Sequence, residues 1–368
     1  MKLVTIVGAR PQFIKAAAVS RAIRKHNSGN RANQIEEIIV HTGQHYDHNM
    51  SQVFFEELDI PAPNYNLEIG SDSHGRQTGR MLEAIEDVLE DEKPDWALVY
   101  GDTNSTLAGA LAAVKMHIPV AHVEAGLRSF NRRMPEEINR VLTDHVSKML
   151  FCPTVTAVEN LQREGILEGV YQVGDVMFDC MLYYRSKIGS GCPALTALGL
   201  DTKGFVLATV HRAENTDSPD ALREIFGAFG EIARQSPVLV ALHPRTRRYL
   251  DSYGIRVAEG VKLLEPAPYL QMIELECNAG VILTDSGGVQ KEAFFVGTPC
   301  ITLREETEWV ETVECGANVI CGASKKRIID AFTDLGKSRH EIICGTGIYG
   351  NGDASEKIVD RLVGAREL

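Results

Sequence analysis

Short apolar runs alternate with longer segments of helical periodicity along almost the whole chain. The runs of the first series lie at residues 2–8, 36–43, 95–102, 119–126 and 148–154, and helical patterns follow them at 11–26, 50–58, 105–116, 135–146 and 156–165. Such alternation is typical of parallel strands joined by crossover helices. It predicts a doubly wound α/β domain.

A second series begins after the Gly- and Pro-containing stretch 189–204. Its strand-like runs lie at 205–212, 237–244, 261–267, 280–287, 299–305 and 317–323. The predicted fold class is therefore α/β, with two Rossmann-like doubly wound domains and a ligand-binding cleft between them. We expect the domains at 1–174 and 175–352. The final helix, 353–368, should pack back onto the first domain with Asp353 as its N-cap.

The most informative motif is TDSGGVQKEAFFVGTP at 284–299, in which an apolar strand runs through Ser286, Gly287 and Gly288 into a helix. Glycines let a ligand approach the backbone, and the free N–H groups of the first helical turn stabilise an anion. Glu292 follows on the same helix, where it can accept hydrogen bonds from a ribose. The motif predicts a cradle for a nucleoside diphosphate, whereas a lone SGG would be read as a helix cap without ligand.

Polar residues cluster at the predicted strand ends, where parallel α/β sheets bind their ligands. They are Arg10, Lys15, Gln44, His45, Asp102, Glu124, Arg128, Glu136, Arg140, His211, Arg212, Glu214, His243, Arg245, Ser286 to Glu292, and Arg304. Taken singly, Asp102 reads better as a cap of the following helix, and Glu136 as a partner of a helix dipole.

Composition narrows the class of protein. A chain of 368 residues suits two domains, and a net charge of −12 disfavours binding to nucleic acid or to a membrane surface. The eight cysteines form no CxxC pair, and the chain opens directly on a strand, so we expect a cytoplasmic protein. The sequence lacks GxGxxG and Walker A motifs, and His41, His45 and His48 make a poor metal set. We therefore expect no cofactor and no metal.

An ordered set of segments resembles the non-hydrolysing UDP-N-acetylglucosamine 2-epimerases. The segments are GARPQFIK, TGQHYDHNM, YGDTNST, HVEAGLRS, MPEEINRVLTDH, HRAEN, HPRT and TDSGGVQKEAFFVGTPCITLR. The resemblance spans nearly the whole chain. It implies the GT-B architecture, a UDP-sugar substrate, a homodimer, and interconversion of UDP-N-acetylglucosamine with UDP-N-acetylmannosamine.

The resemblance also assigns roles to residues. It places the catalytic acids at Asp102, Glu124 and Glu136, and the catalytic histidine at His211. It places the UDP-binding motif at Ser286, Gly287, Gly288 and Glu292, and a regulatory substrate site at Gln44 and His45. Of the remaining strand-end residues, we expect the following to bind substrate: Arg10, Lys15, Arg140, Arg212 and His243.

Two positions depart from the family pattern. Gln12 stands where the family usually has Glu, and Trp309 stands where many bacterial members have another residue. HPRT and ETEWVE also resemble epimerases of UDP-2,3-diacetamido-2,3-dideoxyglucuronic acid, so that sugar is an open alternative. A hydrolysing epimerase, a GT-B glycosyltransferase and a nucleotide-sugar sensor are less favoured alternatives, because three carboxylates and a histidine exceed what a glycosyltransferase or a sensor requires.

The expected chemistry follows from the substrate. The hydrogen at C2 becomes acidic only when the bond from C1 to UDP breaks, so elimination should give a 2-acetamidoglucal and free UDP within the site. Re-addition of UDP, with a proton delivered to the opposite face of C2, inverts that carbon. Carboxylates around the ring supply proton transfer and stabilise developing positive charge. Which carboxylate is the base stays open.

Overall fold

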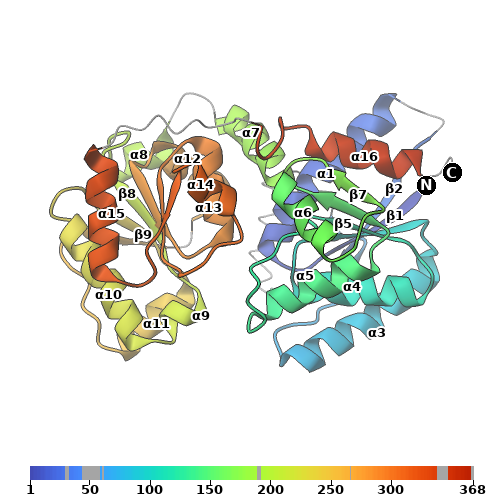
Figure 1. The fold of residues 1–368 in the computed structure, drawn as a ribbon, viewed down its shortest axis with the longest axis horizontal. Coiled ribbons are helices and arrows are strands. Elements are labelled where there is room, and N and C mark those ends of the chain that lie inside the picture. Colours follow the sequence, from blue (N-terminus) through green and yellow to red (C-terminus); the bar gives the residue numbers. More distant parts are fainter. Residues whose placement is uncertain are drawn as a thin grey trace. The chain divides into compact units, whose positions relative to one another are not determined.

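The computed structural model describes residues 1–29, 33–43, 59, 62–188, 192–265, 267–337 and 347–365. The chain divides into two compact units, Met1–Leu182 with Gly347–Leu368, and Tyr183–Thr346 (Figure 1). The expected domain limits at 174 and 352 stay predictions, since compactness alone does not test independent folding. None of the helices described here is long and apolar enough to cross a membrane.

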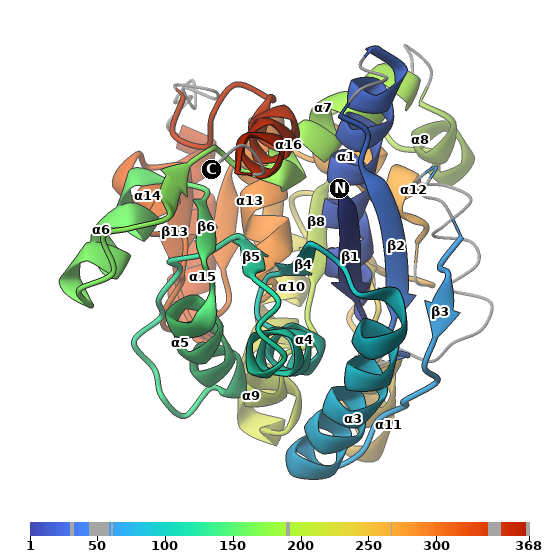
Figure 2. The ribbon, with the colours of Figure 1, turned by 90° about the vertical axis from the view of Figure 1, so that its right-hand side faces the viewer.

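The first unit is built on a parallel sheet with the strand order β3-β2-β1-β4-β5-β6-β7 (Figure 2). Connections leave β1 and β4 in opposite directions, which creates a switch point between these neighbouring strands. The strands are β1 (Lys2–Val7), β2 (Glu36–His41), β3 (Tyr65–Asn66), β4 (Trp96–Tyr100), β5 (Val120–Val123), β6 (Met149–Cys152) and β7 (Val170–Gln172).

Helices cover both faces of this sheet (Figure 1). The apolar side of α3 packs with the Ala-rich α4 over β1, β2 and β4. The close approach of α4 requires a glycine, because a Cβ on Gly109 would lie 2.7 Å from Ile6 Cδ1. On the other face, α1 packs against α16. The helices are α1 (Arg10–Gly29), α3 (His74–Glu92), α4 (Asn104–Lys115), α5 (Pro135–Val146), α6 (Val155–Arg163), α7 (Val176–Ile188) and α16 (Ala354–Gly364).

The C-terminal helix α16 belongs to the first unit, as the sequence suggested. Asp353 stands at its N-cap position but makes no capping hydrogen bond with its side chain. The capping carboxylate is that of Asp179 in α7, which accepts from Ala354 N at 3.2 Å and Ser355 N at 2.7 Å. The expectation that Asp353 caps this helix is therefore wrong, because a carboxylate distant in sequence satisfies the free N–H groups.

Sequence analysis missed three elements, α3 and β3 of the first unit and α7, which begins in it. Helix α3 carries Met81, Ile85 and Leu89 on its buried side, a spacing that predicts an amphipathic helix. Strand β3 is two residues long, Tyr65–Asn66, which is too short to show an alternating pattern. The helix expected at 50–58 lies outside the described residues.

The second unit repeats the same topology, with the strand order β10-β9-β8-β11-β12-β13 and all pairs parallel. Its switch point lies between β8 and β11. The two sheets confirm the fold class of two Rossmann-like halves. The strands are β8 (Val206–Thr209), β9 (Val238–Ala241), β10 (Val261–Leu264), β11 (Val281–Thr284), β12 (Cys300–Thr302) and β13 (Asn318–Ile320).

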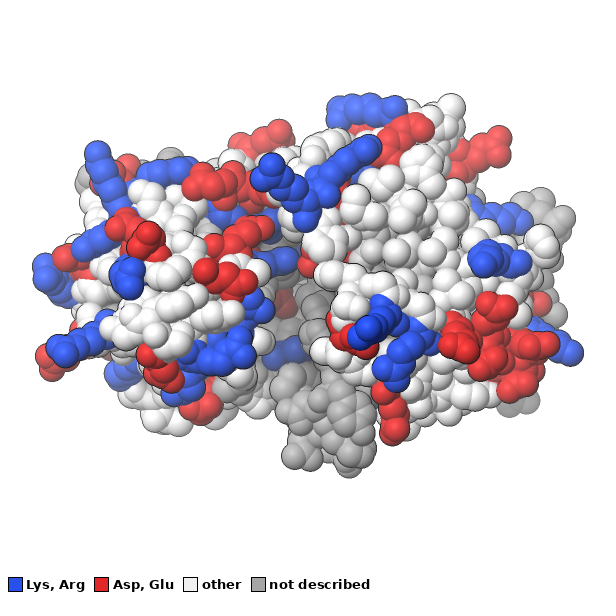
Figure 3. Space-filling model, turned by 90° about the horizontal axis from the view of Figure 1, so that it is seen from below, with Lys and Arg blue, Asp and Glu red and all other residues white. Residues whose placement is uncertain are grey.

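The second sheet also has a core on each face. Phe226, Phe229 and Ile232 of α10 pack over one face with α15, and Leu195, Leu275 and Ala293 pack over the other. On the face drawn in Figure 3, acidic and basic side chains are interspersed. The helices are α8 (Pro193–Leu198), α9 (Ala213–Thr216), α10 (Pro219–Ile232), α11 (Pro244–Ser252), α12 (Tyr269–Asn278), α13 (Gly287–Val296), α14 (Val310–Glu314) and α15 (Lys325–Lys337).

Candidate active site

In the first unit, Asp102 follows β4 directly at the switch point. Its Oδ2 accepts hydrogen bonds from Arg140 Nε at 2.9 Å and Nη2 at 2.7 Å. The cap of the following helix α4 is Thr103, which forms a capping box with Thr106. The carboxylate of Asp102 is therefore not a helix cap, and the capping interpretation of this residue is wrong.

Glu124 follows the neighbouring strand β5 and has an unusual backbone conformation. Its φ of +73° lies in the left-handed region, which costs about 1–3 kcal/mol for a residue other than glycine. Its carboxylate forms an ion pair with Lys15 of α1, and only 8% of the Glu124 side chain and 9% of the Lys15 side chain remain exposed. The strain is therefore held by a buried contact between two elements.

Glu136 lies in the first turn of α5, directly after Pro135 at the N1 position. One turn later on the same helix, Arg140 binds Asp102. Strands β4 and β5 are paired, so Asp102 and Glu124 emerge at the same edge of the sheet. Asp102 and Glu124 thus lie at the carboxyl edge of one sheet, and Glu136 lies one turn before Arg140, which binds Asp102.

Gln12 is buried in the first turn of α1, the helix that follows β1. Its Oε1 accepts from Gly8 N at 2.8 Å and Ala9 N at 2.9 Å, while its Nε2 donates to Tyr100 O at 2.8 Å and Thr106 Oγ1 at 2.9 Å. The amide joins the loop after β1 to the loop after β4. A glutamate could not donate to the carbonyl of Tyr100, so the departure at position 12 has a structural reason in this chain.

In the second unit, α13 begins at Gly287 after β11. Ser286 occupies the N-cap, and its Oγ accepts from Val289 N at 3.4 Å. A Cβ on Gly287 would lie 3.3 Å from Trp309 Nε1, so the turn has little room for a side chain. The Lys291 ammonium lies 4.0 Å from the centroid of the Trp309 ring. This geometry fits the predicted anion seat, with a buried cation in the same helix.

A buried carboxylate joins this seat to the neighbouring loop. Asp285 accepts hydrogen bonds from His211 N, Arg212 N and Asn215 Nδ2, each at 3.0 Å, and no part of its side chain is exposed. Because β8 and β11 are paired at the switch point, Asp285 fixes the HRAEN loop beside the Ser286 turn. Sequence analysis did not assign this role to Asp285.

The pKa of the His211 imidazole lies below its ordinary value, although about a third of this side chain, 36%, is exposed. Burial lowers the pKa of its imidazole, the charges of Arg212 and Arg304 lower it further, and Asp285 opposes this shift only in part. The His243 ring centroid lies 5.8 Å from that of His211, and His243 Nδ1 accepts from Arg245 N at 3.1 Å. Arg245 itself binds Asp217 and Thr216. The second unit therefore offers a neutral imidazole beside an anion seat.

Comparisons with known proteins agree with these two sites. The sequence pattern of the UDP-N-acetylglucosamine 2-epimerase family matches residues 27–363. The chain belongs to this family. It is 46% identical to the UDP-N-acetylglucosamine 2-epimerase of Methanocaldococcus jannaschii, and the match covers 98% of each chain. It is 53% identical to the UDP-2,3-diacetamido-2,3-dideoxy-D-glucuronate 2-epimerase of Pseudomonas aeruginosa, over 98% of this chain and 99% of that one.

Solved structures of this epimerase family give the same fold. The M. jannaschii enzyme in complex with UDP-GlcNAc and UDP has a TM-score of 0.91 at 45% identity, over 99% of this chain and 100% of that one. The Neisseria meningitidis enzyme bound to UDP-GlcNAc has a TM-score of 0.90 at 33% identity, with the same coverage. The protein is an enzyme with the GT-B-like fold of these epimerases.

Some expected site residues of this epimerase take part in contacts within the protein. Lys15 and Arg140 each bind a carboxylate of the acid cluster, and Arg304 binds Glu308 at 3.0 and 3.1 Å. Arg304 was named only as a polar residue at a strand end, and the expected contacts of Lys15 and Arg140 with substrate stay predictions. The same holds for the remaining ones, Arg10, Arg212, His243, Ser286, Gly287, Gly288 and Glu292.

Two further expectations concern ions and regulation. Among the described residues, no group of three or more His, Cys, Asp and Glu side chains could hold a metal ion. Gln44 and His45, the expected regulatory pair, lie outside the described residues.

Proposed function

We propose that this epimerase interconverts UDP-N-acetylglucosamine and UDP-N-acetylmannosamine by inverting C2. The observation that carries the proposal is the pair of complementary sites at the two switch points. One holds Asp102 and Glu124, with Glu136 on the adjacent helix α5, and the other holds the N-terminus of α13, next to Asp285, which binds the backbone of Arg212. The first suits proton transfer around a sugar ring, and the second suits a diphosphate.

The proposed reaction proceeds by elimination and re-addition. UDP departs with the electron pair of the bond between C1 and oxygen, a carboxylate removes the proton from C2, and a double bond forms between C1 and C2. UDP then adds back to C1 of the 2-acetamidoglucal while a proton reaches the opposite face of C2. Asp102, Glu124 and Glu136 transfer protons and stabilise the cationic ring, and the neutral His211 acts at the diphosphate end.

An isotope experiment tests this reaction. Purified enzyme is incubated with UDP-N-acetylglucosamine in deuterium oxide, and both nucleotide sugars are followed by proton NMR. The expected product carries deuterium at C2 and keeps its UDP. Inversion without deuterium would contradict the elimination. Free sugar with UDP would indicate a hydrolysing epimerase, and turnover only with an added acceptor would indicate a glycosyltransferase.

A second substrate has specific support. The identity of 53% to the P. aeruginosa enzyme exceeds that of 46% to the M. jannaschii enzyme, so UDP-2,3-diacetamido-2,3-dideoxy-D-glucuronate is the alternative sugar. Parallel assays with both compounds decide between them through the ratio of kcat/KM values. A ratio of about 100 in either direction, roughly 2.7 kcal/mol of differential binding in the transition state, would assign the substrate.

We also propose a homodimer. Large apolar side chains are exposed on the first unit, and a second copy could cover them. Light scattering after gel filtration would test this, since a mass of 40.5 kDa would show a monomer. The cytoplasmic location stays a prediction, which cell fractionation would test. The exposed side chains include Phe130, Ile138, Leu142, Val155 and Leu167.

A further inference from the structure

His122 of the HVEAG segment is buried under the acid cluster, and the proposed chemistry does not use it. It lies on β5, two residues before Glu124, and none of its side chain is exposed. Its Nε2 lies 2.8 Å from the carbonyl oxygen of Gly101, and its Nδ1 lies 2.7 Å from Asp144 Oδ1. Both ring nitrogens are therefore engaged.

The partners fix the protonation of this ring. A carbonyl oxygen only accepts, so Nε2 must donate to Gly101. Asp144 also accepts from Arg128 Nη1 at 2.7 Å and Gly126 N at 3.1 Å, as an ionised carboxylate does. Burial raises the pKa of Asp144, but the hydrogen bond and charge of His122, together with Arg128, outweigh burial and lower it. Nδ1 must therefore donate as well, and His122 is an imidazolium.

These bonds hold the two loops that carry catalytic candidates. Gly101 directly precedes Asp102 and has a left-handed backbone. It lies close to the ion pair of Lys15 and Glu124, because a Cβ on Gly101 would lie 3.0 Å from Lys15 Nζ and 3.2 Å from Glu124 Oε2. Gly126 comes two residues after Glu124, and Asp144 binds its N–H. Through Asp144, His122 thus links the backbone beside Asp102 to the backbone beside Glu124.

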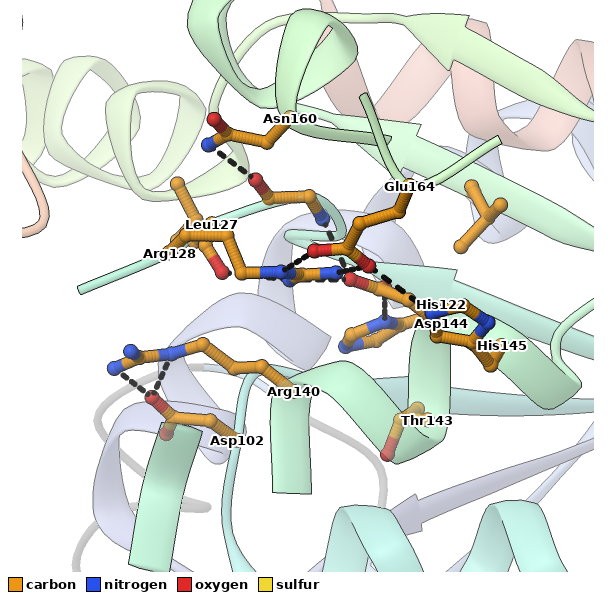
Figure 4. A network of polar contacts seen from close by, with 12 residues as sticks. Asp102, His122, Leu127, Arg128, Arg140, Thr143, Asp144, His145, Asn160 and Glu164 are labelled. Carbon is orange, nitrogen blue, oxygen red and sulfur yellow. Dashed lines mark hydrogen bonds and ion pairs between the residues drawn. The ribbon is translucent and has the colours of Figure 1, made fainter. Parts of the chain in front are cut away.

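The charged side chains of this network alternate in sign out to Glu164, which is partly exposed and also lies 3.0 Å from His145 Nε2. Arg128 donates from Nε and Nη2 to Glu164 at 2.7 and 2.9 Å, so two cations alternate with two carboxylates (Figure 4). A buried charge without a partner would cost several kcal/mol, whereas this set is paired throughout. The sequence placed Arg128 among the strand-end candidates, but its guanidinium is buried and binds Asp144 and Glu164.

We propose that His122 is a positioning residue, which sets the relative placement of the Asp102 and Glu124 carboxylates through its two hydrogen bonds, to Gly101 and to Asp144. This inference rests on the proposed function for its kinetic consequence. Loss of the bond to Gly101 should displace the loop that carries Asp102. Loss of the bond to Asp144 should mainly lower stability, because Arg128 Nη1 and Gly126 N still bind that carboxylate. The two contacts of one side chain can be separated by mutation.

A matched pair of variants separates them. In His122→Gln the amide nitrogen reaches the position of Nε2 and keeps the bond to Gly101, while in His122→Asn it reaches the position of Nδ1 and keeps the bond to Asp144. We expect kcat to fall about 10-fold in the first variant and about 1,000-fold in the second, with KM within about 3-fold of wild type. The order of Tm should be the reverse, with His122→Asn more stable.

This reversed order distinguishes positioning from a structural role. If His122 only stabilised the fold, kcat would decrease in the same order as Tm, and that result would overturn the proposal. Equal kcat in both variants would overturn it too.

Two measurements need no substrate, so they separate failure of this inference from failure of the proposed function. First, ¹⁵N NMR at pH 8 should show protons on both nitrogens of His122, assigned by their loss in His122→Gln. A single protonated nitrogen would contradict the imidazolium. Second, amide hydrogen exchange at residues 101–103 should accelerate in His122→Asn and not in His122→Gln. Unchanged exchange in both would overturn the positioning role, even if wild type proved inactive on both UDP sugars.

Discussion

The two units share one topology, and each fixes its active loops with a buried aspartate, but the two aspartates have different partners. Asp144 of the first unit binds two cations, His122 and Arg128, whereas Asp285 of the second unit accepts mainly from backbone N–H groups. The first unit must hold several carboxylates at one sheet edge, so it surrounds them with positive side chains. In the second, the proposed diphosphate site requires free N–H groups and positive charge. The carboxyl edges of the two sheets thus have the same topology but differ in the charge of the groups that they hold.

The largest expected effect tests the acid side of this comparison. Asp102→Asn keeps the shape of the side chain but removes the charge that Arg140 binds. We expect kcat to fall by about 10³–10⁴, with the Kd of UDP unchanged within about 3-fold. Steady-state kinetics and calorimetry measure the two quantities, with the exposed Asp220→Asn as the control. An equal loss of UDP binding would show that the two sites are not specialised.

A second variant tests the anion side. Asp285→Asn cannot accept from His211, Arg212 and Asn215 as a carboxylate does, so the HRAEN loop should lose its fixed position. We expect the Kd of UDP to rise about 10- to 100-fold and Tm to fall, because hydrogen bonds to a buried charge contribute about 1.5–3 kcal/mol. Asp144→Asn is the matched variant in the first unit. If Asp144→Asn weakened UDP binding as much, the contrast between the two aspartates would be lost.

A smaller effect is expected from Gln12→Glu. The carboxylate would face the carbonyl of Tyr100, which needs a donor, while the bonds from Gly8 and Ala9 would survive. We expect the free energy of unfolding to fall by about 1–3 kcal/mol, measured by urea denaturation. Gln12→Met, which removes all four hydrogen bonds but adds no charge, is the control. Unchanged stability of Gln12→Glu would mean that the carboxyl binds there in its protonated form.

The smallest effect concerns pH. The pKa of His211 in the folded protein lies below its ordinary value of 6.5, so the unfolded chain binds the proton more readily. As pH falls below about 6.5 toward the folded pKa, stability must decrease. The Tm of the wild type should therefore decrease more between pH 7.5 and pH 5.5 than the Tm of His211→Asn. Differential scanning calorimetry measures both decreases. A larger loss in the variant would reverse the sign of the inferred shift.

The sequence predicted the sheets, the switch-point residues and the helix N-terminus at Gly287, because each depends on local periodicity or on a short motif. It could not predict that Asp102 binds Arg140 or that Asp179 caps α16, since these partners are far apart in the chain. His122 and Asp144 were missed for the same reason, and Gln12 was noted only as a departure from the family pattern, without its hydrogen bonds. A buried polar residue in a motif shows that a partner is needed, but not where that partner lies.

The left-handed backbone of Glu124 has a practical consequence for engineering. Glycine adopts this conformation without strain, but Glu124→Gly would also leave the buried Lys15 ammonium without its partner. Losing one member of a buried ion pair costs about 3–5 kcal/mol, more than the strain of about 1–3 kcal/mol that glycine would relieve. A library designed to raise heat resistance at this position must therefore vary Lys15 together with Glu124.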